Sequence, residues 1–232
     1  MTLNPLQPEI LFSLGPVAVS RAVVTTWAIM AVLTAVAWLG LSHASVRPGP
    51  VQTILETLVL AIKGQIEEVL RRDATAYLPL IGTLFIFIIV SNLSSTIPGL
   101  KSPTAHLETT AALATIVFFS VHYFGIRARG LGGYLKHYAS PSILLLPLNL
   151  LEEFTRIFSL MVRLFGNIMS HELIIAVIVS LAGLFVPIPF MLLGLLIGII
   201  QAYIFTILAT VFIAAAVQPE DEASNSRIRK AV

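Results

Sequence analysis

Residues 156–174 read RIFSLMVRLFGNIMSHELI, which places two arginines and a glutamate inside one of the most apolar parts of the chain. A charged side chain at the centre of a bilayer costs roughly 2.5–3.5 kcal/mol on insertion scales. Such a residue therefore faces protein or a water-filled cavity, and it usually marks an ion pathway. The stretch also decides the fold, because the apolar run around it is more than long enough to cross a membrane.

The composition of the whole chain is that of a membrane protein. Of its 232 residues, 57% are hydrophobic and only 11% are charged, and the mean hydropathy is +0.93. A soluble domain carries about 25% charged residues. The net charge of +2 does not indicate a nucleic-acid partner, because the basic residues lie in loops beside apolar segments. The chain has no cysteine, which excludes disulfides and thiolate metal sites, and we expect no cofactor and no metal.

Five long apolar stretches predict membrane-embedded helices, and a sixth stretch predicts an amphipathic helix. The apolar stretches cover residues 22–42, 77–97, 109–126, 142–182 and 187–217. Residues 51–72 instead carry apolar residues at helical spacing with charged residues between them. That pattern favours a helix at the membrane surface or packed against other helices. We expect an all-α polytopic membrane protein that forms a single membrane domain over residues 1–232.

The last two apolar stretches are too long to stand upright in a bilayer. A helix over 142–182 would rise about 60 Å, roughly twice the thickness of the hydrocarbon core. Ordinary tilt of about 20° does not absorb that excess. Only VPIP, residues 186–189, separates the two stretches, and proline disfavours continuation of a helix. The lengths predict a hairpin of two strongly tilted helices over 142–217, although a broken or kinked helix would also fit.

The distribution of basic residues predicts the orientation of the chain. Ten Lys and Arg residues lie in loops 43–76 and 127–141 and in the tail, 218–232, while the opposite side has only Arg21 and Lys101. Basic loops stay in the cytoplasm. We therefore expect the amino-terminal segment, 1–21, outside and the tail inside.

Helical geometry separates the polar residues of the opening stretch. Arg156 and Arg163 are seven residues apart and share a face, and Asn167 lies one turn beyond Arg163. Glu172 comes nine residues after Arg163, so it points to roughly the opposite side of the helix. Arg163 and Glu172 therefore do not form a salt bridge within the helix.

Each of these residues also has a purely structural interpretation. Glu152 and Glu153 lie within a turn of Arg156, which favours a structural ion pair there. Arg163 has no acidic residue within a turn, so its partner must come from elsewhere in the chain or from another subunit. Asn167 fits a hydrogen bond between helices as well as a functional role. His171, taken alone, fits a packing role.

The motif RLFGN (163–167), preceded by EFTRIFSLMV and followed by HELI, resembles the signature of subunit a of F-type ATP synthases. Three further segments agree with this family: SNLSSTIPG (91–99), SPTAHLETTAALA (102–114) and QAYIFTIL (201–208). The resemblance covers the chain from about residue 75 onward.

The resemblance implies the static, ion-translocating subunit of a rotary motor, which is not an enzyme on its own. A ring of c subunits, each with a membrane carboxylate, would turn against it, and peripheral-stalk b subunits and the rest of the complex would be further partners. Arg163 matches the family's essential arginine. Arginine stays protonated, so it favours the ionised form of a facing carboxylate, which then releases its ion. We expect a bacterial inner membrane, because no organelle-targeting segment is evident, although an organelle-encoded chain would also fit.

The family also implies roles for the residues around the arginine. Glu172 matches a polar or acidic position in the outer half-channel, where it would relay ions. Asn167 and Gln201 match positions near the arginine, and Gln201 would help to hold the guanidinium of Arg163. Ser159 matches a small polar residue on the same helix.

On the inner side, the chain departs from the family pattern. Glu153 and Arg156 match the family's EF-S/T-R run, but many relatives have a glutamate fourteen residues before the arginine, where this chain has Asn149. Glu152 or Glu153 would then supply the inner acid.

On the outer side, relatives often carry a His or Glu seven residues before the glutamine, where this chain has Gly194. His171, beside Glu172, would be the substitute, because histidine titrates near neutral pH. The sequence does not distinguish protons from sodium as the coupling ion.

Two other functions, a secondary transporter and an intramembrane hydrolase, fit the sequence less well. A secondary transporter with a substrate-binding arginine predicts repeated halves, and no internal repeat is evident. An intramembrane hydrolase would need a motif such as G-x-S-x-G or H-E-x-x-H, and neither is present. The five histidines are scattered along the chain: His43, His106, His122, His137 and His171.

Overall fold

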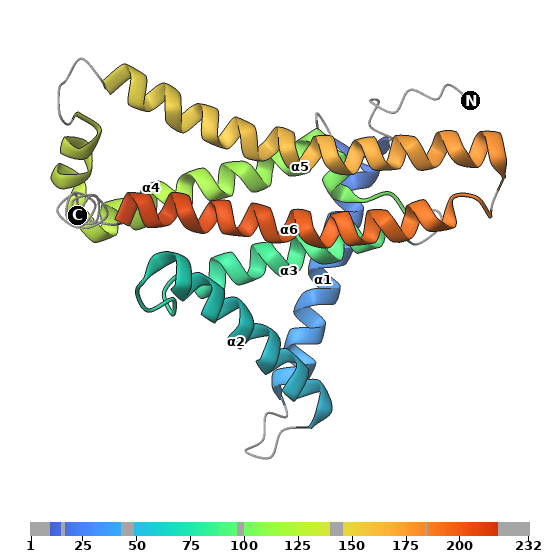
Figure 1. Cartoon of the computed structure of the whole chain (residues 1–232), viewed down its shortest axis with the longest axis horizontal. Coiled ribbons are helices and arrows are strands. Elements are labelled where there is room, and N and C mark those ends of the chain that lie inside the picture. The colour runs from blue at the N-terminus through green and yellow to red at the C-terminus, as the bar shows by residue number, and fades with distance from the viewer. Residues whose placement is uncertain are drawn as a thin grey trace, which may run out of the picture.

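Two long helices, α5 (Leu146–Ala182) and α6 (Ile188–Val217), run side by side along the molecule (Figure 1). At 1.5 Å per residue, α5 rises about 55 Å. α5 ends at Gly183, whose φ of +77° is a conformation that glycine adopts without strain, and Pro187 leads into α6. The predicted hairpin is therefore confirmed, and α5 is one continuous helix.

The computed structural model describes residues 10–14, 17–42, 49–96, 100–139, 146–183 and 185–217. Within these ranges the chain forms six α-helices, one short 3-10 helix and a two-stranded antiparallel hairpin. Besides α5 and α6, the elements are β1 (Ile10–Leu14), β2 (Val17–Ser20), α1 (Arg21–Ser42), α2 (Pro50–Leu70), α3 (Leu78–Ser94), η1 (Pro103–Ala105) and α4 (Leu107–Ala139).

The direction of α1 shows how the hairpin can fit a membrane. In Figure 1, α1 runs across the direction of α5 and α6. α1, α4, α5 and α6 are each long and apolar enough to cross a bilayer, and the 17-residue α3 is a shorter apolar helix. A bilayer that α1 crosses upright has α5 and α6 strongly inclined, which absorbs their extra length. The chain is thus the all-α polytopic membrane protein that the apolar runs predict.

The core lies where α3 and α4 pack against the hairpin. Its fully buried side chains come from all four of these helices and include Ile81, Ile88, Val117, Leu164 and Phe205. α1 contributes little to this core and exposes large apolar side chains such as Trp38, which fits a helix that faces lipid. The packing holds α5 and α6 in fixed register.

The helix α2 is amphipathic, as predicted. Ile62, Ile66 and Leu70 are buried, and the ammonium of Lys63 lies 3.5 Å from the Glu67 carboxylate and 3.9 Å from that of Asp73. Hydrogen bonds from the hydroxyl and the peptide N–H of Thr75 lower the pKa of Asp73, so this carboxylate stays ionised near neutral pH.

Two features differ from the sequence-based expectation. In the amino-terminal segment, residues 10–14 and 17–20 form two antiparallel strands, in which Leu14 pairs with Val17. The helix expected over 109–126 continues to Ala139, with a break at Gly130, where φ is +73° and ψ is 160°. The loop expected after residue 126 is therefore partly helical. Arg129 explains part of the extension, because it donates a hydrogen bond to the Ala215 carbonyl in the last turn of α6.

Candidate ion-translocation site

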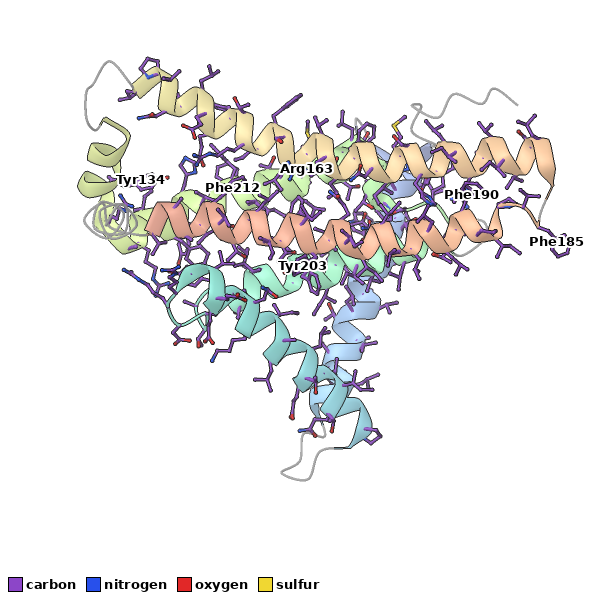
Figure 2. All side chains as sticks on the ribbon, in the orientation of Figure 1. Tyr134, Arg163, Phe185, Phe190, Tyr203 and Phe212 are labelled. Atoms are coloured by element: carbon purple, nitrogen blue, oxygen red, sulfur yellow. The ribbon has the colours of Figure 1, made fainter. Side chains whose placement is uncertain are left out.

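Arg163 lies midway along the hairpin, between α5 and α6 in the view of Figure 2. It is exposed, and within the described part of the chain no acidic side chain pairs with it. It faces a cavity of about 260 Å³. The cavity is lined by Glu152, Thr155, Arg156, Ser159, Leu160, Arg163, Leu208 and Phe212. Arg163 and Ser159 therefore line one cavity whose walls are mostly apolar, and the guanidinium is available to a partner outside the chain.

Arg156 has the structural role that its spacing predicts. Its guanidinium bonds to the Glu152 carboxylate, lies 3.9 Å from the Glu153 carboxylate, and stands 5.7 Å from the centre of the Phe212 ring. Arginine favours this combination of ion pairing and ring contact. The charge of Arg156 is thus compensated within the chain, in contrast to that of Arg163.

The two candidate inner acids point in different directions. Glu152 is exposed and lines the cavity that contains Arg163, whereas Glu153 is only 7% exposed and is absent from that lining. Consecutive helical residues differ by about 100°, which accounts for the separation. Asn149 is half-buried and is also absent from the cavity lining. Of the two acids, only Glu152 therefore lines the cavity that Arg163 also lines.

Asn167 joins the two helices of the hairpin. Its side-chain amide donates a hydrogen bond of 2.7 Å to the Gln201 carbonyl oxygen on α6. Gln201 is 2% exposed, and its Nε2 is buried without a hydrogen-bond partner among the described residues. In that part of the chain, Gln201 bonds to Asn167 and not to Arg163.

Glu172 points away from the Arg163 cavity, as the nine-residue separation predicts. Its Oε1 accepts a hydrogen bond of 2.9 Å from the peptide N–H of Ser102, which precedes η1. The side chain is half-buried. The Glu172 carboxylate is therefore partly buried and hydrogen-bonded on the side of the hairpin that packs against η1.

A cluster of buried hydroxyl and amide groups lies beside Glu172. Ser102 donates to the Ser91 carbonyl at 2.7 Å, Thr104 donates to Asn92 Oδ1 at 2.6 Å, and Asn92 Nδ2 donates to the Gly198 carbonyl at 2.8 Å. The sequence interpretation used these segments as family motifs and did not select their polar side chains. The sequence signal that could have found them is the concentration of Ser, Thr and Asn in the segments 91–99 and 102–114.

His171 fills the space beside Gly194. Its ring stands where a Cβ at residue 194 would project, and its Nε2 lies 2.9 Å from the Phe190 carbonyl of α6. Because a carbonyl only accepts hydrogen bonds, Nε2 carries the proton and Nδ1 is the basic nitrogen. The imidazole of His171 thus occupies the volume that a side chain at residue 194 would take.

Among the described residues, no group of three or more His, Asp or Glu side chains could hold a metal ion.

A family model described as "ATP synthase A chain" matches residues 23–214. The chain belongs to this family. Its members include an "ATP synthase subunit a 2" of Bradyrhizobium sp., which is 58% identical over 94% of this chain and 97% of its own length.

Two further relatives are also named "ATP synthase subunit a 2". The protein of Pelobacter propionicus is 50% identical over 90% of this chain and 92% of its own length, and that of Acaryochloris marina is 47% identical over 94% of each. As a member of the ATP synthase A chain family, the chain is an ion-transporting membrane subunit of an ATP synthase and is not catalytic on its own. Membership decides against the secondary transporter and the intramembrane hydrolase.

Proposed function

We propose that this chain forms two offset half-channels and presents Arg163 to the carboxylates of a c-subunit ring. The observation that carries the proposal is the order of polar sites along the hairpin. In Figure 2, Phe212, which lines the cavity of Arg163 and Glu152, lies to one side of Arg163. Phe190, whose carbonyl bonds to His171, lies to the other side. Arg163 thus lies between the cavity that Glu152 and Ser159 also line and the region of His171.

The permanent positive charge of Arg163 explains how the two half-channels would act on a ring carboxylate. A guanidinium does not lose its proton, and it has no compensating acid in the described residues, so it stabilises the ionised form of a ring carboxylate. The carboxylate then releases its ion on one side of Arg163. It reloads on the other side before it returns to lipid, where its charge would be costly.

Each half-channel has its own proposed ion-binding groups. On the outer side these are Glu172 and His171, with Asn167 and Gln201 nearer to Arg163. On the inner side they are Glu152 and Ser159, while Glu153 and Asn149 lie farther from the cavity. The transported ion is a proton or a sodium ion.

The orientation follows from the basic residues, with the amino terminus outside and the carboxyl terminus in the cytoplasm. Of the inner-side residues, Arg47 and the three in the tail, Arg227, Arg229 and Lys230, lie outside the described residues. The proposed setting is a bacterial inner membrane, and the partners are the c-subunit ring, the peripheral-stalk b subunits and lipid. The ring would face α5 near Gly166, where a Cβ would have no neighbour within 4 Å.

Replacing Glu172 by glutamine is expected to slow ion transport by about tenfold, because the neutral amide cannot bind and release an ion in the outer half-channel. ATP-driven ion uptake into vesicles that contain the assembled complex, measured with and without sodium, checks this and identifies the ion. Glu108→Gln is the matched control, since Glu108 is exposed in the first turn of α4. A transport rate and pH profile equal to those of the wild type would remove Glu172 from the pathway.

Replacing Glu152 by glutamine is expected to slow transport several-fold, whereas Glu153→Gln has a smaller effect on rate. The physical reason is position, because Glu152 alone of the two lines the cavity with Arg163. The same uptake assay, with immunoblots to confirm equal amounts of assembled complex, compares the two variants. Equal losses in both would contradict the assignment of Glu152 as the inner acid.

A further inference from the structure

Among the described residues, the hydrogen bond to the Glu172 carboxylate comes from a peptide group, and the positive charge of Lys101, the residue before Ser102, also acts on that carboxylate. The peptide N–H of Ser102 donates to Glu172 Oε1 at 2.9 Å, and no described residue bonds to Oε2. One carboxylate oxygen is thus fixed, and the other is left for a passing ion. The direction of Oε2 depends on where the Ser102 peptide stands.

The hydroxyl of Ser102 fixes that peptide. Ser102 is fully buried, and its Oγ donates to the Ser91 carbonyl at 2.7 Å and lies 2.6 Å from the Thr104 hydroxyl. Because Ser91 belongs to α3, this bond ties the segment before η1 to the helical core. The single hydroxyl hydrogen can turn between its two neighbours without leaving the cluster.

Thr104 extends the connection to the other helix of the hairpin. It donates to Asn92 Oδ1, and Asn92 Nδ2 donates to the Gly198 carbonyl on α6. The Gly198 carbonyl can only accept, which fixes the orientation of the Asn92 amide and therefore the direction of the Thr104 bond. The bonds from Thr104 to Asn92 and from Asn92 to Gly198 thus reach α6, and the Thr104 hydroxyl lies 2.6 Å from that of Ser102, whose peptide N–H bonds to Glu172 on α5.

We infer that Ser102 is a positioning residue for ion transfer at Glu172: its peptide N–H aims the carboxylate, and its hydroxyl locks that peptide to α3. This inference rests on the proposed role of Glu172 in the outer half-channel. Thr104 supports Ser102 from the side of Asn92 and α6. Misplacement of a reacting group by about 1 Å can lower a rate by about 100-fold, so the position of the Ser102 peptide affects ion transfer at Glu172.

The backbone of Ser102 allows its two contributions to be separated. Its φ of −64° and ψ of 131° are compatible with proline. Ser102→Ala removes the hydroxyl and keeps the N–H, while Ser102→Pro removes both. ATP-driven ion uptake is expected to fall about threefold in the alanine variant and about tenfold in the proline variant, close to the loss in Glu172→Gln.

A double-mutant comparison distinguishes positioning from general stability. If Ser102 acts through Glu172, adding Ser102→Ala or Ser102→Pro to Glu172→Gln is expected to cause no further loss. Thr104→Val is expected to lower uptake and Thr104→Ser to restore it, since serine keeps the hydroxyl. Immunoblots and co-purification report the amount of assembled complex. If the proline variant does not assemble, the inference is tested with Ser102→Ala, Thr104→Val and Thr104→Ser.

Two results would overturn the inference: wild-type uptake in assembled Ser102→Ala and Thr104→Val, or losses that multiply with that of Glu172→Gln. Failure of the proposed function would look different. In that case Glu172→Gln itself would transport at the wild-type rate, whatever the Ser102 variants do.

Discussion

Replacing Arg163 by alanine is expected to abolish ion-driven ATP synthesis while the complex remains assembled. Arg163 is exposed and has no ion pair within the described residues, so its loss removes no internal contact on which the fold depends. Without the cation, a ring carboxylate that faces α5 has no group to stabilise its ionised form. ATP synthesis in energised vesicles, together with co-purification of the other subunits, measures both parts of the prediction.

Arg163→Lys and Arg156→Ala are the informative comparisons. Lysine supplies one compact charge that can lose its proton when desolvated, so we expect Arg163→Lys to restore little synthesis. Arg156 is paired with Glu152 and Glu153, and its replacement is expected to lower stability more than coupling. Coupled synthesis at a substantial fraction of the wild-type rate in Arg163→Ala would refute the assigned role of this arginine.

Replacing Gly194 by valine is expected to disrupt the hairpin, because the new Cβ would stand inside the ring of His171. Either the imidazole leaves the Phe190 carbonyl or α5 and α6 separate. Overpacking of this kind costs about 1–3 kcal/mol. The measurements are the amount of the subunit in the assembled complex and its thermal unfolding midpoint, both of which should fall.

His171→Ala is the matched second change. Combined with Gly194→Val, it frees the space that the imidazole occupied, so assembly and the unfolding midpoint should recover toward those of the wild type. Transport in the double variant then reports what the missing imidazole contributes. A stable Gly194→Val single variant with unchanged assembly would show that the contact between residues 171 and 194 is looser than described.

The elements that could be predicted from the sequence are those that depend on local pattern. Five apolar runs and one amphipathic pattern located the six α-helices of the described residues, and the prolines near the hairpin turn located the break between α5 and α6. The ion pair of Arg156 with Glu152 followed from four-residue spacing on a helix. The opposite directions of Arg163 and Glu172 followed from the rotation per residue.

The remaining features depend on contacts between distant segments. The bond between Ser102 and Glu172 joins residues 70 positions apart, and that between Asn92 and Gly198 joins residues 106 apart. Neither has a local pattern that would predict it. The choice between Glu152 and Glu153 required knowledge of which face of α5 meets the cavity. The helical turns that follow Gly130 were missed, because Gly130, Gly132 and Gly133 favour a loop over a helix.

The inclination of the hairpin has a consequence for the sense of rotation. In a bilayer that α1 crosses upright, α5 runs along the membrane more than through it, and the nine residues from Arg163 to Glu172 become a sideways displacement of about 13 Å. In the proposed mechanism, the outer entrance lies toward the hairpin turn and the inner exit toward the start of α5. The chain direction of α5 therefore determines whether an ion from outside drives the ring clockwise or anticlockwise, and a hairpin inclined the opposite way would drive it in reverse.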